Sequence, residues 1–165
     1  MKKTATKADM PDEWALFGEI WNIYKMFRFA KAWGECVKFV ETIANHHDKY
    51  RGSPLKKMQT DMIHALQDAL DPLFVKEEPG INFHPASAAE VKEEQVVFAD
   101  VLGFMRTYYF CETETDKEEM ERAADELWKK HEPSYLCDGL VRAVVNELDR
   151  RMLGTEITQD GNSTV

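Results

Sequence analysis

The sequence contains little cysteine and no long apolar run, and both absences exclude whole classes of protein. Its three cysteines, Cys36, Cys111 and Cys137, are an odd number and form no CxxC pair, so neither a disulfide framework nor a zinc cluster is indicated. No window approaches the roughly 18 consecutive apolar residues that a membrane-spanning helix needs. The basic N-terminal residues are followed by no apolar stretch, so no secretory signal is predicted. We therefore expect a cytoplasmic protein with reduced thiols and no membrane partner.

Clustered basic residues are also missing. Proteins that bind nucleic acid contact the phosphates through groups of lysine and arginine side chains. The candidates here are short and isolated, namely Lys2, Lys3 and Lys7 near the N-terminus and Lys56 with Lys57 further along. Direct binding to DNA or RNA is therefore not expected.

The residues that are present have the composition of one globular domain. The chain has 165 residues, of which 44% are hydrophobic and 31% charged, with only 8 glycines and 6 prolines. This length is enough to bury a core without disulfides or metal. Apolar residues recur every three or four positions almost throughout, which predicts an all-α fold in which residues 1–165 form a single domain.

Residues that start or stop helices divide the chain into six predicted helices. Proline in a first turn, capping boxes and a terminal glycine are the signals used. The predicted limits are Pro11 to 29, 31–47, Ser53 as N-cap to Pro72, Ser87 in a capping box with Glu90 to about Phe110, Thr115 in a capping box with Glu118 to Trp128, and Ser134 to Gly154.

The apolar periodicity also predicts which side of each helix is buried. For the second helix the predicted inward side consists of Trp33, Val37, Val40, Ile43, Ala44 and His47. For the fifth helix it consists of Met120, Ala123, Ala124, Leu127 and Trp128. Both sets follow the spacing of one face of an α-helix.

The two halves of the chain resemble one three-helix unit written twice. A shift of 81 positions matches Phe17 with Phe98 and Trp21 with Leu102, and shifts of 80 and 78 align the second and third helices with the fifth and sixth. The alternative is that any two amphipathic stretches can be slid into agreement. Duplication predicts a six-helix bundle of two tandem three-helix repeats with pseudo-twofold symmetry, and a helix break near residues 29–32.

The duplication also predicts how the single domain is divided. The divisions are repeat A at 11–71, a linker at 72–86, repeat B at 87–153 and a mobile tail at 154–165. The linker is the internal segment in which prolines and glycine cluster. The tail has little apolar surface to bury.

Negative charge is concentrated in the second half of the chain. Residues 1–80 hold 12 basic and 12 acidic side chains, residues 81–165 hold 9 and 18, and the net charge is −9. Carboxylates complement the dipole in the first turn of a helix, and this ordinary role accounts for part of the excess. The rest predicts a negative surface that attracts a basic protein partner. The predicted acidic face consists of Glu112, Glu114, Asp116, Glu118, Glu119, Glu121, Asp125 and Glu126.

Aromatic residues are a second candidate for an interface. The first helix is apolar on nearly all sides, and packing against the rest of a bundle along one side would bury only part of this apolar surface. Trp14 and Trp21, together with Tyr109, could form an apolar contact with a second copy or a partner, since aromatic residues are enriched at such contacts. The alternative is that the first helix is central and fully enclosed.

No complete catalytic or metal-binding motif is present. The five histidines include no ExxH pair, and the chain has neither a GxSxG nucleophile nor a glycine-rich phosphate loop. His46 and His47 are expected to cap the second helix, where the dipole favours a cation, with His47 a packed ring. Asp61 and His64 have a spacing at which they could share a metal ion. We expect no catalytic residues, no metal ligands and no cofactor.

One enzyme family shares a feature with the chain. Carboxylates at positions i and i+3 face the same side of a helix and can together hold Mg²⁺. Glu90 with Glu93 and Glu118 with Glu121 form ExxE pairs, while no ExxD occurs and Asp68 with Asp71 is the closest approximation to it. In this respect the chain is similar to the all-α MazG-like nucleotide pyrophosphohydrolases, and the resemblance implies Mg²⁺-dependent hydrolysis of nucleotides as an alternative function.

The sequence as a whole predicts a non-enzymatic module that binds another protein. The missing catalytic motifs argue against an enzyme, and the one-sided acidity argues for a basic partner, including one that itself handles nucleic acid. Compact acidic helical proteins look like products of phages and mobile elements, among them anti-CRISPR inhibitors of host defence enzymes. The pyrophosphohydrolase and a homodimer remain the alternatives.

Overall fold

The computed structural model describes residues 2–29, 34–74 and 86–161, with the side chains at 34, 36, 72–74 and 155–161 left aside. These residues form six α-helices and no strand, so the predicted all-α fold is confirmed for this part of the chain. The helices are α1 (Pro11–Arg28), α2 (Gly34–Tyr50), α3 (Lys56–Phe74), α4 (Ala88–Tyr108), α5 (Glu114–His131) and α6 (Tyr135–Gly161).

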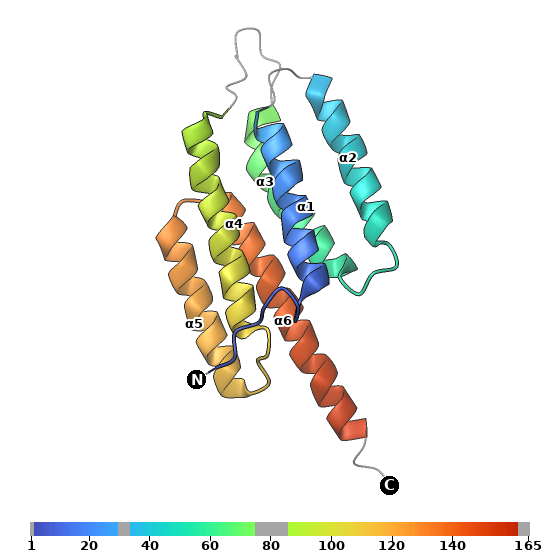
Figure 1. Ribbon diagram of the computed structural model, residues 1–165, viewed down its shortest axis with the longest axis vertical. Helices are drawn as coiled ribbons and strands as arrows, with labels where there is room; N and C mark the ends of the chain where they lie inside the picture. Colours follow the sequence, from blue (N-terminus) through green and yellow to red (C-terminus); the bar gives the residue numbers. More distant parts are fainter. Residues whose placement is uncertain (1, 30–33, 75–85, 162–165) are drawn as a thin grey trace.

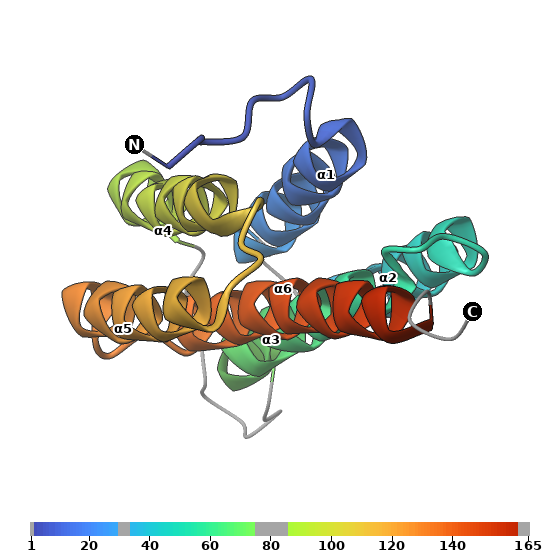
Figure 2. The same cartoon turned by 90° about the horizontal axis from the view of Figure 1, so that it is seen from below.

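The helices are arranged in two layers. In the view along the bundle, α1 and α4 lie side by side above the layer that contains α2, α3, α6 and α5 (Figure 2). Within the larger layer, α3 and α6 are in the most extensive contact, and α2 packs against α3 while α5 packs against α6. The helix α6 runs diagonally through the bundle and extends past the other helices (Figure 1). None of the helices in the described residues is both long and apolar enough to cross a bilayer.

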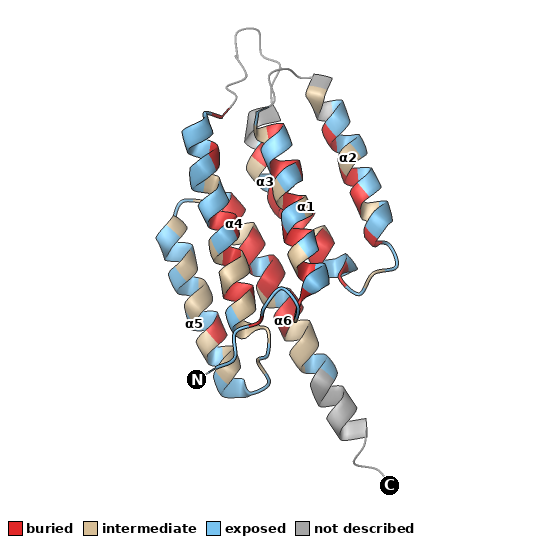
Figure 3. Cartoon of the chain, in the orientation of Figure 1, coloured by how far each residue is buried: buried red, intermediate tan, exposed pale blue. Residues whose placement is uncertain are grey.

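The core lies between the two layers and along the α3–α6 pair (Figure 3). Methionine and aliphatic side chains fill it, because they adapt to the gaps between crossing helices. The central members are completely buried and comprise Leu16, Ile20, Met58, Met62, Ile63, Leu66, Leu70, Met105, Met120 and Leu140. At the α3–α6 crossing, a methyl group placed on Gly139 would lie 2.5 Å from Cβ and 2.9 Å from Cα of Ala65. Glycine therefore sets how closely these two helices approach.

Side-chain caps fix the starts of two helices. The Ser87 hydroxyl accepts a hydrogen bond from the Glu90 N–H, and the Glu90 carboxylate accepts one from the Ser87 N–H, so the predicted capping box at α4 is confirmed. The box predicted from Thr115 is wrong. The cap of α5 is formed two residues earlier by Thr113 with Asp116, because Asp can also close the box and this register starts the helix at Glu114.

The predicted limits of α3 and α6 also differ from the structure. Helix α3 starts at Lys56, and the Ser53 hydroxyl accepts from the N–H of Leu55 in the preceding turn. The same helix continues through Pro72 to Phe74, since a proline in the last turn costs only one intrahelical hydrogen bond. Helix α6 does not stop at Gly154 but continues to Gly161. A glycine within a helix lowers its stability without ending it.

Other predicted divisions fall partly outside the described residues. Helix α1 ends at Arg28 and α2 begins at Gly34, in agreement with a break near 29–32, although residues 30–32 of that break lie outside the described residues. Of the predicted linker 72–86, residues 75–85 lie outside the described residues, as do residues 162–165 of the predicted tail. Among the described cysteines, Cys111 and Cys137 are free thiols, and Cys137 is buried.

The buried side of α2 is not the predicted one. Val37 and Val40 are exposed at 62% and 66%, Ala44 is exposed too, and the predicted Trp33 lies outside the described residues. Of the predicted set Ile43 is buried, and the other inward positions are Phe39, His46 and Tyr50. Larger rings bury more apolar area than valine, and Phe39 packs edge-on against Phe27 of α1 with their ring centroids 4.7 Å apart. Hydrogen bonds from neighbouring helices allow His46 to be buried on this side.

Candidate functional site

The predicted acidic face lies on and just before α5. Six of its members are exposed, and within the described part of the chain none of the six forms an ion pair. These six are Glu112, Glu114, Glu118, Glu121, Asp125 and Glu126. The other two, Asp116 and Glu119, are half-buried and already bound within the chain.

Asp116 and Glu119 both form ion pairs with Lys2, which lies near the N-terminus. Its Nζ lies 2.7 Å from a carboxylate oxygen of Asp116 and donates a second hydrogen bond to Glu119. Hydrogen bonds from Lys2 and from Thr113 hold the pKa of Asp116 well below its ordinary value. Residues 2–10 cross the ends of α4 and α5, where the Ala5 N–H donates to the carbonyl oxygen of Arg106 at 2.9 Å (Figure 1). The protein therefore already binds one lysine at this face.

A single stripe of exposed residues runs along α5. Its members are spaced alternately four and three residues apart, so they share one side of the helix. This α5 stripe consists of Glu114, Glu118, Glu121, Asp125, Trp128 and Glu132. It is acidic along its first part and reaches an exposed indole near the end of the helix.

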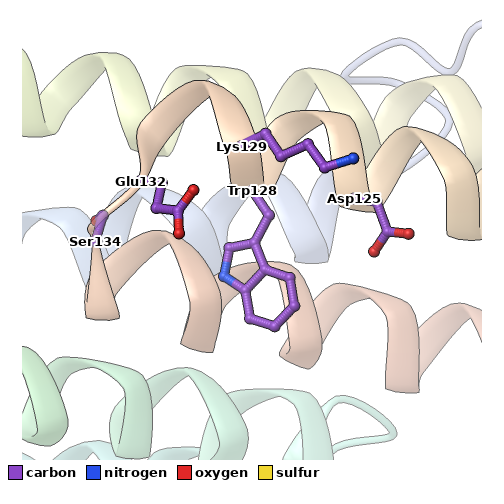
Figure 4. A pocket seen from close by; sticks show the side chains of 5 residues that line it. All are labelled: Asp125, Trp128, Lys129, Glu132 and Ser134. Atoms are coloured by element: carbon purple, nitrogen blue, oxygen red, sulfur yellow. The ribbon is translucent and has the colours of Figure 1, made fainter.

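Trp128 stands between two depressions in the surface beside α5 and α6. The first is about 410 Å³ and is lined by Asp125, Trp128, Lys129, Glu132 and Ser134 (Figure 4). The second, on the α6 side, is lined in part by Arg142, whose guanidinium carbon lies 5.5 Å from the centre of the Trp128 rings. Asp125 borders both depressions.

The sequence prediction for Trp128 was wrong. Trp128 was placed on the buried side of its helix, but 41% of it is exposed, while Met120 is fully buried. The buried side of α5 is narrow because this helix lies at the end of its layer and, of the other described helices, contacts only α4 and α6. Trp128 is one residue past Leu127 and so lies at the edge of that side.

The predicted apolar residues do not form one patch. Trp14 and Trp21 are half-buried and line a shallow groove between α1 and α4, together with Phe17, Phe98 and Leu102. Helix α1 is therefore not fully enclosed. Tyr109 lies elsewhere.

Tyr109 belongs to a polar cluster between α1, α4 and α6. Its hydroxyl donates to Glu13 at 3.2 Å, and its ring faces the guanidinium of Arg151, 4.9 Å away. Arg151 also bridges Glu13 and Glu147, with N···O separations of 2.5 and 3.0 Å. Both glutamates are only 6% exposed, so the arginine neutralises two buried carboxylates.

A second polar cluster, which the sequence did not predict, connects α1, α2 and α3. His46 lies between the Glu19 carboxylate, 2.8 Å from its Nε2, and the fully buried Gln59, whose amide nitrogen donates to its Nδ1 at 2.8 Å. Half-buried His47 donates to the Gln59 side-chain oxygen at 3.0 Å rather than packing as an apolar ring. Glu19 also accepts from Lys49 and Tyr50. Both ring nitrogens of His46 are satisfied in the neutral form.

We expect acid to destabilise this second cluster. Burial lowers the pKa of His46, although Glu19 acts in the opposite direction. Burial would also raise the pKa of Glu19, but the hydrogen bonds from Lys49 and His46 outweigh it and the pKa is lowered. In both cases the folded state takes up the proton less readily than the unfolded state, so stability falls as pH drops below 6.5 and again below 4.5.

Two measurements check this expectation. NMR titration of His46 should give a pKa below 6.5, the ordinary value of the ring. Urea unfolding should show a lower free energy at pH 5.5 than at pH 7.5, and His46→Gln should flatten this difference. A His46 pKa above 6.5, or a slope unchanged in the variant, would contradict the role given to the cluster.

The residues suggested as metal ligands are not brought together. Glu90 is engaged in the α4 cap, whereas Glu118 and Glu121 are exposed on α5 and Asp68 and Asp71 on α3. Asp61 lies 3.6 Å from Arg150, and His64 is exposed. Among the described residues, no group of three or more His, Cys, Asp or Glu side chains is placed to hold a metal ion.

Comparison with known proteins assigns neither a family nor a function to the chain. No protein-family model, no curated protein and no solved structure matches the chain. The six-helix fold and the chemistry of its surfaces are therefore the basis for the function proposed below.

Proposed function

We propose that this protein is a non-enzymatic interaction module whose α5 stripe binds a basic protein. The observation that carries the proposal is the stripe itself: four exposed carboxylates in line lead to an exposed tryptophan beside a depression. Charged residues along such a surface steer a partner of opposite sign, and an aromatic residue gives the contact an apolar anchor. The Lys2 contact supports the same chemistry, because it places an ammonium group on neighbouring carboxylates.

The basic surfaces that fit this stripe include those that bind nucleic acid. An acidic helix that covers such a surface would compete with the phosphate backbone. Inhibition of a nucleic-acid-handling enzyme, of the kind encoded by phages and mobile elements, is therefore the form of the proposal that best uses the charge distribution. The experiment below addresses the binding surface, whichever basic protein is the partner.

Reversal of charge on the stripe should strongly weaken binding to a basic peptide. Glu114→Lys, Glu118→Lys and Glu121→Lys together should weaken the binding of a capped octalysine peptide by at least about tenfold, because attraction becomes repulsion. Isothermal titration at about 0.15 M salt, where exposed charges more than about 8 Å apart are largely screened, measures the change. Circular dichroism should remain that of the unmodified protein, since all three side chains are exposed.

A matched variant separates a local effect from one of net charge. Glu41→Lys, Asp68→Lys and Glu93→Lys alter the total charge equally, and these residues are exposed on α2, α3 and α4. We expect this variant to bind the peptide within about threefold of the unmodified protein, since the changes are remote from the stripe. Equal losses in the two triple variants would refute the α5 stripe as the binding surface.

We also propose that the bundle consists of two tandem three-helix repeats related by a pseudo-twofold axis. The pattern of helix contacts supports this proposal, because every contacting pair remains a contacting pair when α1, α2 and α3 are exchanged with α4, α5 and α6. The groove between α1 and α4 supports it residue by residue. Its lining residues pair at a separation of 81 positions, as Trp14 with Gln95, Phe17 with Phe98, Gly18 with Ala99 and Trp21 with Leu102.

Polar contacts across the same interface follow the shift of 81 as well. The Tyr109 hydroxyl donates to Glu13, and the Arg28 guanidinium donates to Glu94 at 2.9 Å. Glu13 corresponds to Glu94 and Arg28 to Tyr109 under the shift. An experimental structure in which residues 11–71 and 87–153 do not superpose would contradict the duplication.

A homodimer would use the half-buried aromatic groove between α1 and α4, to which Trp14 and Trp21 contribute. Its formation would appear as a concentration-dependent mass near twice 19.1 kDa.

The pyrophosphohydrolase alternative is tested by Mg²⁺-dependent release of pyrophosphate from a panel of nucleotides. The interaction proposal predicts no turnover in that assay.

A further inference from the structure

We infer that the depression beside Trp128 receives an arginine side chain of the basic partner. The inference rests on the proposed function and assigns its anchor point. Carboxylates of Asp125 and Glu132 lie on either side of the indole along the α5 stripe, three residues before it and four after it (Figure 4). A cation in this depression would therefore meet an aromatic surface that has a carboxylate at each end.

The helix end adds to the attraction for a cation. Helix α5 ends at His131, so the depression lies beside the carbonyl end of the helix, where the dipole is negative. Lys129 also lines the depression, but its ammonium extends along the helix toward Asp125, away from Glu132 (Figure 4). The size, about 410 Å³, is within the range of sites that enclose a small ligand or a long side chain.

The chain's own contacts favour arginine over lysine. The guanidinium of Arg142 already approaches the Trp128 indole from the α6 side, and that of Arg106 approaches the Trp14 indole at 5.4 Å. The lysines of the N-terminal segment instead approach the single rings of Tyr108 and Phe110. A planar guanidinium can stack on an indole while it donates two hydrogen bonds to one carboxylate, whereas an ammonium group is a compact point charge.

The experiment compares capped octaarginine with capped octalysine, which carry equal charge. Isothermal titration of the unmodified protein should give about three- to fivefold tighter binding of octaarginine. Trp128→Leu should abolish this preference while octalysine binding is kept, and Trp128→Phe should retain part of it because a ring remains. Tyr135→Ser is the matched control, since Tyr135 is a 75% exposed aromatic that does not line the depression.

Each outcome bears on one of the two proposals. Equal affinities for the two peptides, or a preference that survives Trp128→Leu, would overturn the arginine site and leave the α5 stripe as the binding surface. An equal loss for both peptides in Trp128→Leu would also overturn the choice of arginine. Failure of the unmodified protein to bind either peptide would overturn the proposed function itself. Circular dichroism of both Trp128 variants establishes that the helices are intact.

Discussion

Replacement of Arg151 by alanine is expected to lower the free energy of unfolding by roughly 3 kcal/mol. The substitution removes the bridge between Glu13 and Glu147, two carboxylates that are each 6% exposed. Among the described residues, Glu13 then keeps only the Tyr109 hydroxyl as a partner, whereas Glu147 keeps Arg150. Removal of one partner of a buried pair costs about 3–5 kcal/mol, and the partial exposure of Arg151 places this case at the low end. The melting temperature should fall by roughly 6–12 °C.

Two further variants test this explanation. Glu13→Gln in the Arg151→Ala background should recover part of the loss, because it removes the stranded buried charge. Arg51→Ala, which breaks an exposed ion pair with Asp48, should cost less than about 1 kcal/mol. Urea unfolding measures all three variants. A loss below about 1 kcal/mol in Arg151→Ala, or no recovery with Glu13→Gln, would mean that the ion pairs of Arg151 with Glu13 and Glu147 do not stabilise the fold as described.

The substitution Gly139→Ala is expected to cost about 1–3 kcal/mol. Alanine is the better helix former by about 1 kcal/mol, so propensity alone predicts the opposite sign. The added methyl group would, however, lie 2.9 Å from the Cα of Ala65. This atom belongs to the backbone of α3, so the contact cannot be relieved by a change of rotamer and the α3–α6 pair must separate. Thermal and urea unfolding measure the effect.

The same substitution at Gly103 is the control. Gly103 lies within α4, and a methyl group there would have no atom of another helix within 4 Å. Gly103→Ala should therefore stabilise the protein by about 0.5–1 kcal/mol. If both substitutions stabilise the protein, the close approach of α3 and α6 described here is incorrect.

The periodicity of apolar residues was sufficient to predict the number and order of the helices. It failed where burial depends on partners from other helices. His46 is predicted to cap the second helix because it is polar and lies near the end of that helix. In the structure it is buried, and its hydrogen bonds with Glu19 and Gln59 satisfy the ring nitrogens there. Neither partner is local in the sequence, so a helix pattern cannot reveal them. The valines of α2 are exposed for the related reason that larger rings occupy the inward positions.

The acidic face was predictable from composition, whereas its organisation was not. A run of carboxylates after Cys111 is visible in the sequence, but Lys2 lies more than a hundred residues away and binds two of them. Trp128 was assigned to the core by period alone. The members of the α5 stripe are spaced alternately four and three residues apart in the sequence. The burial of each residue is needed to show that these positions, rather than others with the same spacing, are the exposed ones.

The central claim is that the α5 stripe is where a basic polypeptide binds. Amide chemical-shift mapping with capped octalysine tests it most directly, because it reports on every part of the surface in one titration. If the stripe is the binding surface, the largest shifts fall on Glu114, Glu118, Glu121, Asp125 and Trp128, with salt-dependent amplitudes. Shifts centred on α2 and α3, or spread evenly over the exposed carboxylates of all six helices, would contradict it.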